Sequence, residues 1–177
     1  PENGQVFVGL FGYGNGCQIS NLSLKNSDIT VDVNDAAVSV GAILGRTDEF
    51  GTGAIITNCT NDGKIFASTG SVGGIAGSFE KGIITGCKNY GTIDASTAAV
   101  GGIISYLNDG AITNCQNYSI IGSKATITSV CGGIAASSGG NTETCTNYGN
   151  ITSSYEAGGI VGSNWGLIAH CGNYGKI

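Results

Sequence analysis

Short apolar runs, separated by glycine and asparagine, recur along this 177-residue chain at a nearly constant period. The clearest repeated phrase is centred on a cysteine, and its five copies read ITNCTNDGKI, ITGCKNYGTI, ITNCQNYSII, TETCTNYGNI and IAHCGNYGKI. Successive copies lie 28, 28, 30 and 26 residues apart. A repeat of this length is one supersecondary unit that buries its apolar face only by stacking on its neighbours. The period therefore predicts a solenoid.

A second phrase, rich in glycine, precedes each cysteine copy: VGAILG at Val40, VGGIAG at Val72, VGGIIS at Val100, CGGIAA at Cys131 and AGGIVG at Ala157. A weaker first unit, VGLFG at Val8 followed by CQISNLSL at Cys17, completes a set of six. Short β-prone runs bounded by glycine and asparagine indicate strands. We predict the glycine-rich phrase, the stretch before the cysteine and the stretch after it as three short strands of one coil. The predicted fold is all-β, a parallel β-helix of about six coils.

Stacking should align equivalent residues of successive coils in columns. Two isoleucine columns are expected inside, one formed by Ile43, Ile75, Ile103, Ile134 and Ile160 and the other by Ile56, Ile84, Ile112 and Ile168. A bend at Thr85-Gly86 would let Ile84 and the cysteine after it both point inward. A third isoleucine position, expected to start the third strand, is occupied by Ile65, Ile93, Ile121, Ile151 and Ile177.

The repeat cysteines form a column of their own: Cys59, Cys87, Cys115, Cys145 and Cys171. A coil spacing of about 4.8 Å would permit disulfides between adjacent rungs. We expect buried free thiols instead, because cysteine is a readily buried small residue and a column of five cannot pair completely.

Two residues beyond each cysteine is an asparagine, and these are Asn61, Asn89, Asn117, Asn147 and Asn173. Stacked asparagines can pair their amides from coil to coil and also tolerate a left-handed backbone. The glycines two positions further on, Gly63, Gly91, Gly149 and Gly175, are expected to have positive φ.

We expect residues 1–177 to form a single solenoid domain, with 1–37 as an atypical first coil and 38–177 as regular coils. In the first coil Leu22 replaces the cysteine, Leu24 replaces the asparagine, and about ten extra residues follow, through DITVDVNDAA. The chain stops inside the pattern at Ile177. We therefore expect a fragment of a larger repeat protein, its open last coil continued by further repeats or another domain.

Composition narrows the class of protein. The chain has 32 glycines and no apolar stripe of helical period, which argues against helices. Its net charge is −5 with only seven Lys and Arg residues, so nucleic acid is not an expected partner. No apolar run approaches the ~18 residues of a membrane span, and we expect no membrane insertion.

The sequence contains few candidates for catalytic residues. The single histidine, His170, cannot supply the two histidines of a zinc peptidase motif, and its neighbour Cys171 should point to the opposite face of a strand. The carboxylates are dispersed, except in the turns after the first strands, where Asp48, Glu49, Glu80 and Asp109 are weak calcium candidates. Solvated turns explain these equally well, and we expect neither a basic partner nor a cleft beside them. We predict no catalytic residue and no cofactor.

Aromatic side chains are the better candidates for binding. One set lies in the same turns and includes Phe79, Tyr106 and Trp165, together with Tyr13 and Phe50. A second set follows the asparagines as a column of Tyr90, Tyr118, Tyr148 and Tyr174. Exposed rings stack on sugars, whereas rings stacked on one another shield the turn and strengthen coil pairing. Both interpretations remain open.

The two phrases together resemble the GLUG-type repeats of bacterial secreted and cell-surface proteins. VGLFGYGNGCQISNLSL at Val8 and VGGIAGSFEKGIITGCKNYGTI at Val72 carry the resemblance best. Such repeats occur in adhesin-like proteins and in non-catalytic regions of IgA-specific zinc metallopeptidases. The resemblance implies a right-handed solenoid located extracellularly or at the bacterial cell surface, and no activity for the repeats.

We therefore predict a non-catalytic structural or adhesive module, acting as a rigid spacer or as a binding surface. The alternative is a carbohydrate-binding module, or an accessory region of a secreted polysaccharide-degrading enzyme or peptidase. In either case the expected partner is a glycan or protein of a host or of the environment.

Overall fold

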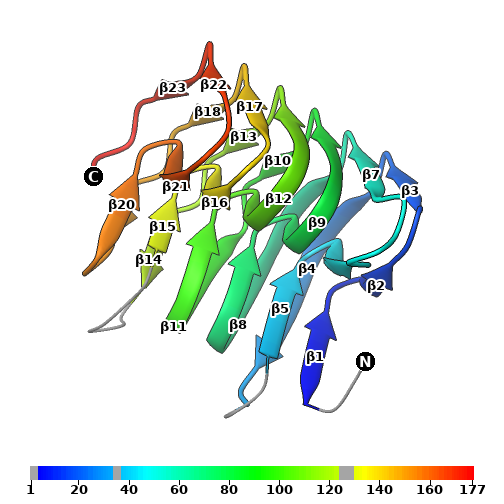
Figure 1. Cartoon of the computed structure of the whole chain (residues 1–177). Coiled ribbons are helices and arrows are strands. Elements are labelled where there is room, and N and C mark those ends of the chain that lie inside the picture. Colours follow the sequence, from blue (N-terminus) through cyan, green and yellow to red (C-terminus); the bar gives the residue numbers. More distant parts are fainter. Residues whose placement is uncertain (1–3, 34–36, 124–129) are drawn as a thin grey trace.

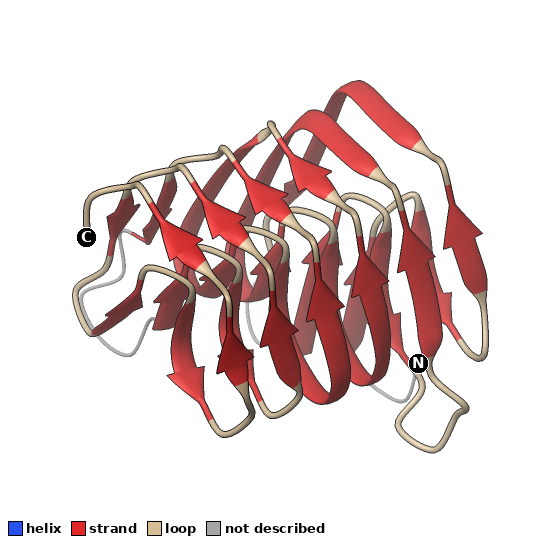
Figure 2. Ribbon diagram, turned by 90° about the horizontal axis from the view of Figure 1, so that it is seen from above, coloured by secondary structure: helices blue, strands red, loops and turns tan. Residues whose placement is uncertain are grey.

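Parallel strands wind into a stack of coils in the computed structural model, which describes residues 4–33, 37–123 and 130–177 (Figures 1 and 2). The glycine-rich phrases align in register through all six repeats, from Val8 through Val40, Val72, Val100 and Cys131 to Ala157. The predicted all-β solenoid is confirmed. The described residues contain no helix, and so none that is long and apolar enough to cross a membrane.

Within the described residues the strands form two parallel sheets. The larger sheet consists of β1 (Gln5–Val8), β4 (Ser23–Val31), β5 (Ala37–Gly41), β8 (Thr60–Gly73), β10 (Lys88–Asn89), β11 (Thr92–Gly101), β13 (Gln116–Asn117), β14 (Ile121–Ser123), β15 (Val130–Gly132), β18 (Thr146–Asn147), β19 (Ile151–Thr152), β20 (Glu156–Gly158) and β23 (Gly172–Asn173). The second consists of β2 (Phe11–Gly14), β3 (Gln18–Ser20), β6 (Leu44–Thr47), β7 (Ala54–Thr57), β9 (Ala76–Thr85), β12 (Ile104–Thr113), β16 (Ala135–Ser138), β17 (Asn141–Glu143), β21 (Val161–Asn164) and β22 (Ile168–Ala169).

The glycine-rich phrase forms a corner rather than the single strand we predicted. In the second coil β5 ends at Gly41 and β6 begins at Leu44, in the other sheet. A Cβ atom at Gly73, the equivalent of Gly41, would collide with the carbonyl oxygen of Ala76, so only glycine lets the chain turn this tightly. Conversely, the predicted third strand runs on into the first strand of the next coil, as β8 and β11 show.

Two apolar clusters fill the interior along the stack. The first contains the isoleucine columns through Ile43 and Ile56 together with the repeat cysteines. The second joins the column through Val40 and Val72 to the isoleucines that follow each asparagine turn, such as Ile65. The two isoleucine columns that we expected inside, through Ile43 and through Ile56, are buried in the central coils. In the last coil Ile168 is 41% exposed.

A left-handed residue stands immediately before each repeat cysteine. The φ angles are 52° at Asn58, 65° at Gly86, 53° at Asn114, 54° at Thr144 and 53° at His170. Glycine and asparagine adopt this conformation at little cost. The kink interrupts strand alternation and directs both Ile84 and Cys87 inward, which confirms the bend expected at Thr85-Gly86.

We expected positive φ at the glycines after the asparagine turns, and this prediction is wrong. None of these glycines has a positive φ, namely Gly63, Gly91, Gly149 and Gly175. The asparagines of the column do not have one either. Close packing between coils accounts for glycine at these four positions, although the equivalent position in the coil of Asn117 holds Ser119. A Cβ at Gly91 would overlap the carbonyl oxygen of Gly63, one coil below.

The first coil differs from the others in its sheet register. Leu24 of β4 pairs with Asn61 of β8, as the sequence alignment implied, and a bulge follows between Lys25 and Asp28. Asn26, inside the bulge, has a φ of 52°. Residues 34–36 of the expected insertion lie outside the described part of the chain.

Candidate functional site

The asparagine column is a continuous ladder of amide hydrogen bonds. Each side-chain Nδ2 donates to the Oδ1 of the next coil, at 3.0 Å from Asn61 to Asn89, 3.1 Å to Asn117, 2.8 Å to Asn147 and 2.8 Å to Asn173. The Oδ1 of Asn89 also accepts from the backbone N–H of Gly91 at 3.2 Å. The first four asparagines are fully buried. The ladder therefore satisfies buried polar groups and ties each turn to the next.

The cysteine column runs beside the ladder, inside the first apolar cluster. All seven cysteines of the chain are free thiols; Cys17 and Cys171 are half-buried and the others are buried. The thiol of Cys115 contacts two backbone carbonyls, that of Thr113 in its own coil at 3.3 Å and that of Ile84 in the preceding coil at 3.7 Å. Burial raises the pKa of Cys131 and of Cys171 above the ordinary thiol value. Cys131 lies in the second apolar cluster, outside the column, and its raised pKa, like that of Cys171, leaves little thiolate. The four column thiols that are fully buried, from Cys59 to Cys145, are packing residues that solvent does not reach.

The tyrosine column stands on the outer side of the asparagine turns. Ring centroids are 4.7 Å apart from Tyr90 to Tyr118, 4.7 Å from Tyr118 to Tyr148 and 5.4 Å from Tyr148 to Tyr174, with interplanar angles of 15°, 11° and 11°. The rings are 39–75% exposed. Because each interior ring has a neighbour on both faces, Tyr118 and Tyr148 present only edges and hydroxyls to solvent. Sugar stacking on those two rings is therefore blocked.

Phe79 is not exposed on the turns, so its prediction as a binding aromatic is wrong. Its side chain is fully buried in the first apolar cluster and pairs in register with the buried Leu107. The strand pleat explains this, because it places Phe79 on the face of β9 that packs in the first apolar cluster and its neighbour Glu80 on the opposite face, where Glu80 pairs with Arg46. An apolar ring in this column extends the core instead of meeting a ligand.

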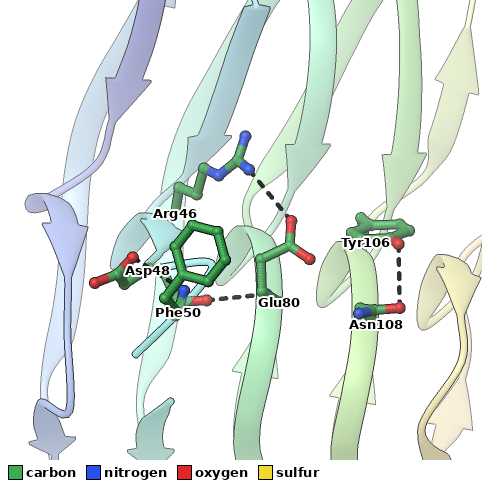
Figure 3. A network of polar contacts seen from close by, with 7 residues as sticks. Arg46, Asp48, Phe50, Glu80, Tyr106 and Asn108 are labelled. Atoms are coloured by element: carbon green, nitrogen blue, oxygen red, sulfur yellow. Dashed lines mark hydrogen bonds and ion pairs between the residues drawn. The ribbon is translucent and has the colours of Figure 1, made fainter. Parts of the chain in front are cut away.

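The other two predicted turn aromatics remain at the surface. Tyr106 is half-buried, and its hydroxyl donates to Oδ1 of Asn108 at 3.4 Å (Figure 3). Trp165 is 73% exposed and follows β21. The register places Tyr106 level with Ser137 and Ser163, so Tyr106 and Trp165 lie two coils apart and form no shared platform.

The four carboxylates considered for calcium do not converge. Glu80 pairs with Arg46 at 3.2 Å, and Asp109 pairs with Lys81 at 3.6 Å (Figure 3 shows the first pair). Asp48 accepts from the side chain of Asn15 at 2.9 Å and from the backbone N–H of Phe50 at 3.2 Å. Among the described residues no three His, Cys, Asp or Glu side chains lie close enough to hold a metal. The expectation that these turns lack basic partners is wrong.

The expectation that no cleft lies beside these turns is also wrong. A pocket of about 530 Å³ opens between the first two coils, with Phe7 and Tyr13 on one side and Arg46, Asp48, Glu49 and Phe50 on the other. Sequence reasoning named Tyr13 and Phe50 but missed Phe7 and the pocket itself. The available signal was the length of the turn after Arg46, which is greater than in any later coil.

His170 does not form a nucleophile pair with Cys171. The histidine is exposed at the left-handed position, while the thiol packs against the first apolar cluster and lies 3.5 Å from the carbonyl oxygen of Thr142. The two side chains point away from each other.

No protein-family model matches this chain, and no curated protein matches it. Among solved structures it is similar to a "putative immunoglobulin A1 protease" from Bacteroides ovatus, with a TM-score of 0.64 and 24% sequence identity. The match covers 96% of this chain and 53% of that one, so this chain spans about half the length of the protein it matches. A likeness at this level of identity establishes the shared solenoid fold.

Proposed function

We propose that this chain is a non-catalytic β-solenoid module of an exported bacterial protein, acting as a rigid spacer that displays a binding surface. The asparagine ladder carries the proposal. Four consecutive amide hydrogen bonds, from Asn61 to Asn173, link five coils through buried side chains. Bending the stack would open these bonds in a water-free interior, where an unpaired polar group costs about 1–3 kcal/mol.

The distribution of titratable groups supports a role without catalysis. General acid–base chemistry needs a positioned titratable group within hydrogen-bond reach of the reacting centre. Here His170 is exposed in the last coil, and the Arg46 guanidinium is engaged by Glu80 at 3.2 Å. The carboxylate of Asp109 lies in a different turn, paired with Lys81. The pocket between the first two coils is lined by Arg46 with Asp48 and Glu49, and neither His170 nor Asp109 is among its lining residues.

The comparison with the longer Bacteroides ovatus protein supports an accessory place for such a module. That protein is named a protease, and this chain matches about half of its length. We propose that the solenoid positions a partner domain or a surface outside the cell, as the resemblance to GLUG-type repeats also implies.

Cleavage and stiffness are the properties to measure. Purified chain incubated with immunoglobulin A1, casein and pectic and mucin-type glycans should release no product. The chain placed between donor and acceptor fluorescent proteins should give one narrow energy-transfer distribution that moderate salt leaves unchanged. A Gly/Ser linker of equal length should give a broad one. Cleavage that disappears on Glu80→Gln or Asp109→Asn substitution, or a distribution as broad as that of the linker, contradicts the proposal.

One observation favours carbohydrate binding as a second function. Trp165 is 73% exposed, and an exposed indole face is a common platform for a sugar ring. Retention on a polysaccharide column should then fall on Trp165→Ala substitution and remain after Tyr155→Ala, which removes another exposed ring, 65% accessible. Equal retention of both variants contradicts this second function.

A further inference from the structure

An insertion in the second coil builds the pocket between the first two coils. Eight positions separate Arg46 from Ala54, whereas four separate their partners Ser78 and Gly82 in the next coil, and four separate Tyr106 from Gly110. The solenoid therefore closes this corner without the extra residues. Insertions in a repeat array commonly form loops on the binding face. The insertion carries Asp48, Glu49 and Phe50.

Aromatic rings form much of the pocket wall. Phe7 and Tyr13 stack with their centroids 5.8 Å apart, and the Arg46 guanidinium carbon lies 5.5 Å from the centre of the Phe7 ring. Phe50 is 92% exposed, the largest value among the large apolar side chains of the described residues. The open rings of Phe50 and of Tyr13, which is 53% exposed, are therefore available to a ligand.

The side chains that line the pocket carry an excess of negative charge. Arg46 is compensated by Glu80 at 3.2 Å, with both side chains mostly buried. In the described part of the chain no ion pair joins Asp48 or Glu49 to a lysine or arginine. Asp48 is instead held in place by Asn15 and by the N–H of Phe50. Figure 3 shows Asp48 beside Phe50. Two carboxylates without cationic partners thus stand beside two open aromatic faces.

We propose that this pocket binds the cationic side chain of a partner polypeptide, an arginine guanidinium or a lysine ammonium. The cation would lie over the Phe50 or Tyr13 ring, and the carboxylates of Asp48 and Glu49 would neutralise its charge. This combination favours organic cations over neutral ligands. The volume of about 530 Å³ lies within the usual range of ligand pockets and accommodates a long side chain with its flanking peptide. A neutral sugar would use the rings but would leave the excess negative charge uncompensated.

Short peptides test the proposal directly. Calorimetric titration of the whole chain with acetyl-glycyl-arginyl-glycine amide should show saturable binding, and the lysine peptide should behave similarly. The citrulline peptide has nearly the same shape without the charge and should bind at least about tenfold more weakly. Raising the salt concentration should weaken binding of the arginine peptide, because the attraction is partly between exposed charges.

Variants locate the site. Asp48→Asn combined with Glu49→Gln, and separately Phe50→Ala, should each lower the affinity for the arginine peptide several-fold. Asp62→Asn removes an exposed carboxylate and Tyr155→Ala an exposed ring, both outside the pocket, and these should leave the affinity unchanged. An unchanged melting temperature shows that the pocket variants are folded.

Several results would overturn the assignment. These are equal binding of the citrulline and arginine peptides, no loss of affinity in the Asp48/Glu49 variant, or binding of methyl glycosides in place of the peptides. None of these outcomes bears on the spacer role, which the fluorescence distribution measures separately.

Discussion

Asn117 donates a hydrogen bond from its side-chain Nδ2 to Oδ1 of Asn147 at 2.8 Å, and both amides are fully buried. The Oδ1 of Asn117 also accepts from Asn89 at 3.1 Å and from the backbone N–H of Ser119 at 3.2 Å. One side chain therefore joins three coils. The parallel ladders of the backbone hold the strands together, while this amide column holds the turns.

Replacing Asn117 with alanine should destabilise the protein by about 2–4 kcal/mol. The change removes several hydrogen bonds and leaves the amide of Asn89 and the Oδ1 of Asn147 without a side-chain partner in a buried site. Urea unfolding followed by circular dichroism measures the difference. The matched control is Asn108→Ala, at an exposed asparagine, which should stay within about 0.5 kcal/mol of the native protein. Equal midpoints for the two variants would show that the ladder adds no stability.

Gly102→Ala should destabilise the solenoid by about 1–3 kcal/mol or more. A Cβ atom there would lie 2.1 Å from the carbonyl oxygen of Gly133 and 2.4 Å from Cγ of Asn117, and neither group has room to move. Gly122→Ala is the control, since a Cβ at that position meets nothing within 4 Å. The control should be neutral or slightly stabilising, because alanine restricts the unfolded chain. Thermal melts of the two variants should therefore shift in clearly different ways, and a similar loss in both would contradict the packing argument.

Tyr118→Ala should cost about 1–3 kcal/mol, because each of two stacked ring pairs contributes about 0.5–1.5 kcal/mol beyond simple area burial. Tyr118→Phe keeps both stacks and loses only a hydroxyl that bonds Gln116 at 3.2 Å on the surface. It should unfold within about 0.5 kcal/mol of the native protein. Tyr174→Ala removes a ring with a single stacked neighbour at 5.4 Å and should cost less than Tyr118→Ala. Denaturant midpoints that rank these three differently would argue against a stabilising column.

Thiol accessibility should follow the burial of the columns. In native protein a neutral disulfide reagent should react only with Cys17 and Cys171, and slowly, because the other five thiols are buried. After unfolding in guanidinium all seven should react. Rapid native reaction of Cys115 would contradict the position of this column.

Alkaline pH should weaken the fold. Burial raises the pKa of Cys131, so between the ordinary thiol pKa of about 8.5 and the higher native value the unfolded chain loses this proton while the folded chain keeps it. The unfolded state then binds fewer protons, and stability falls as pH rises. Below about pH 8 this contribution is constant.

The slope from one such thiol is at most about 1.4 kcal/mol per pH unit. Urea midpoints between pH 7.5 and 10.5 should show the decline, and Cys131→Ala should reduce its slope relative to native protein. An identical slope in that variant would assign the decline to other groups.

The period of the repeat determined much of this protein by itself. Once one coil spans 26–30 residues and every strand pairs with its own copy, like residues must stack, so the sequence specified the contents of each column. The buried isoleucines through Ile75, the paired amides through Asn117 and the stacked rings through Tyr118 all follow from counting. The bend before Cys87 could also be predicted, because Ile84 and Cys87 are both apolar but lie three positions apart, and a regular strand would point them to opposite faces.

Only the tertiary structure decided what lies between the columns. Whether Phe79 points inward depends on where the backbone turns its corner, and that corner lies inside a glycine-rich phrase whose pattern does not mark it. The left-handed residue of this coil is Gly86, directly before Cys87, and not Gly91. Gly91 is instead a position where close contact between adjacent coils leaves no room for a Cβ atom. The contact of Arg46 with Phe7, and the pocket around it, joins side chains of different coils across an insertion that breaks the period. Periodicity predicts what repeats, whereas the pocket that we propose as a binding site lies where the repeat is interrupted.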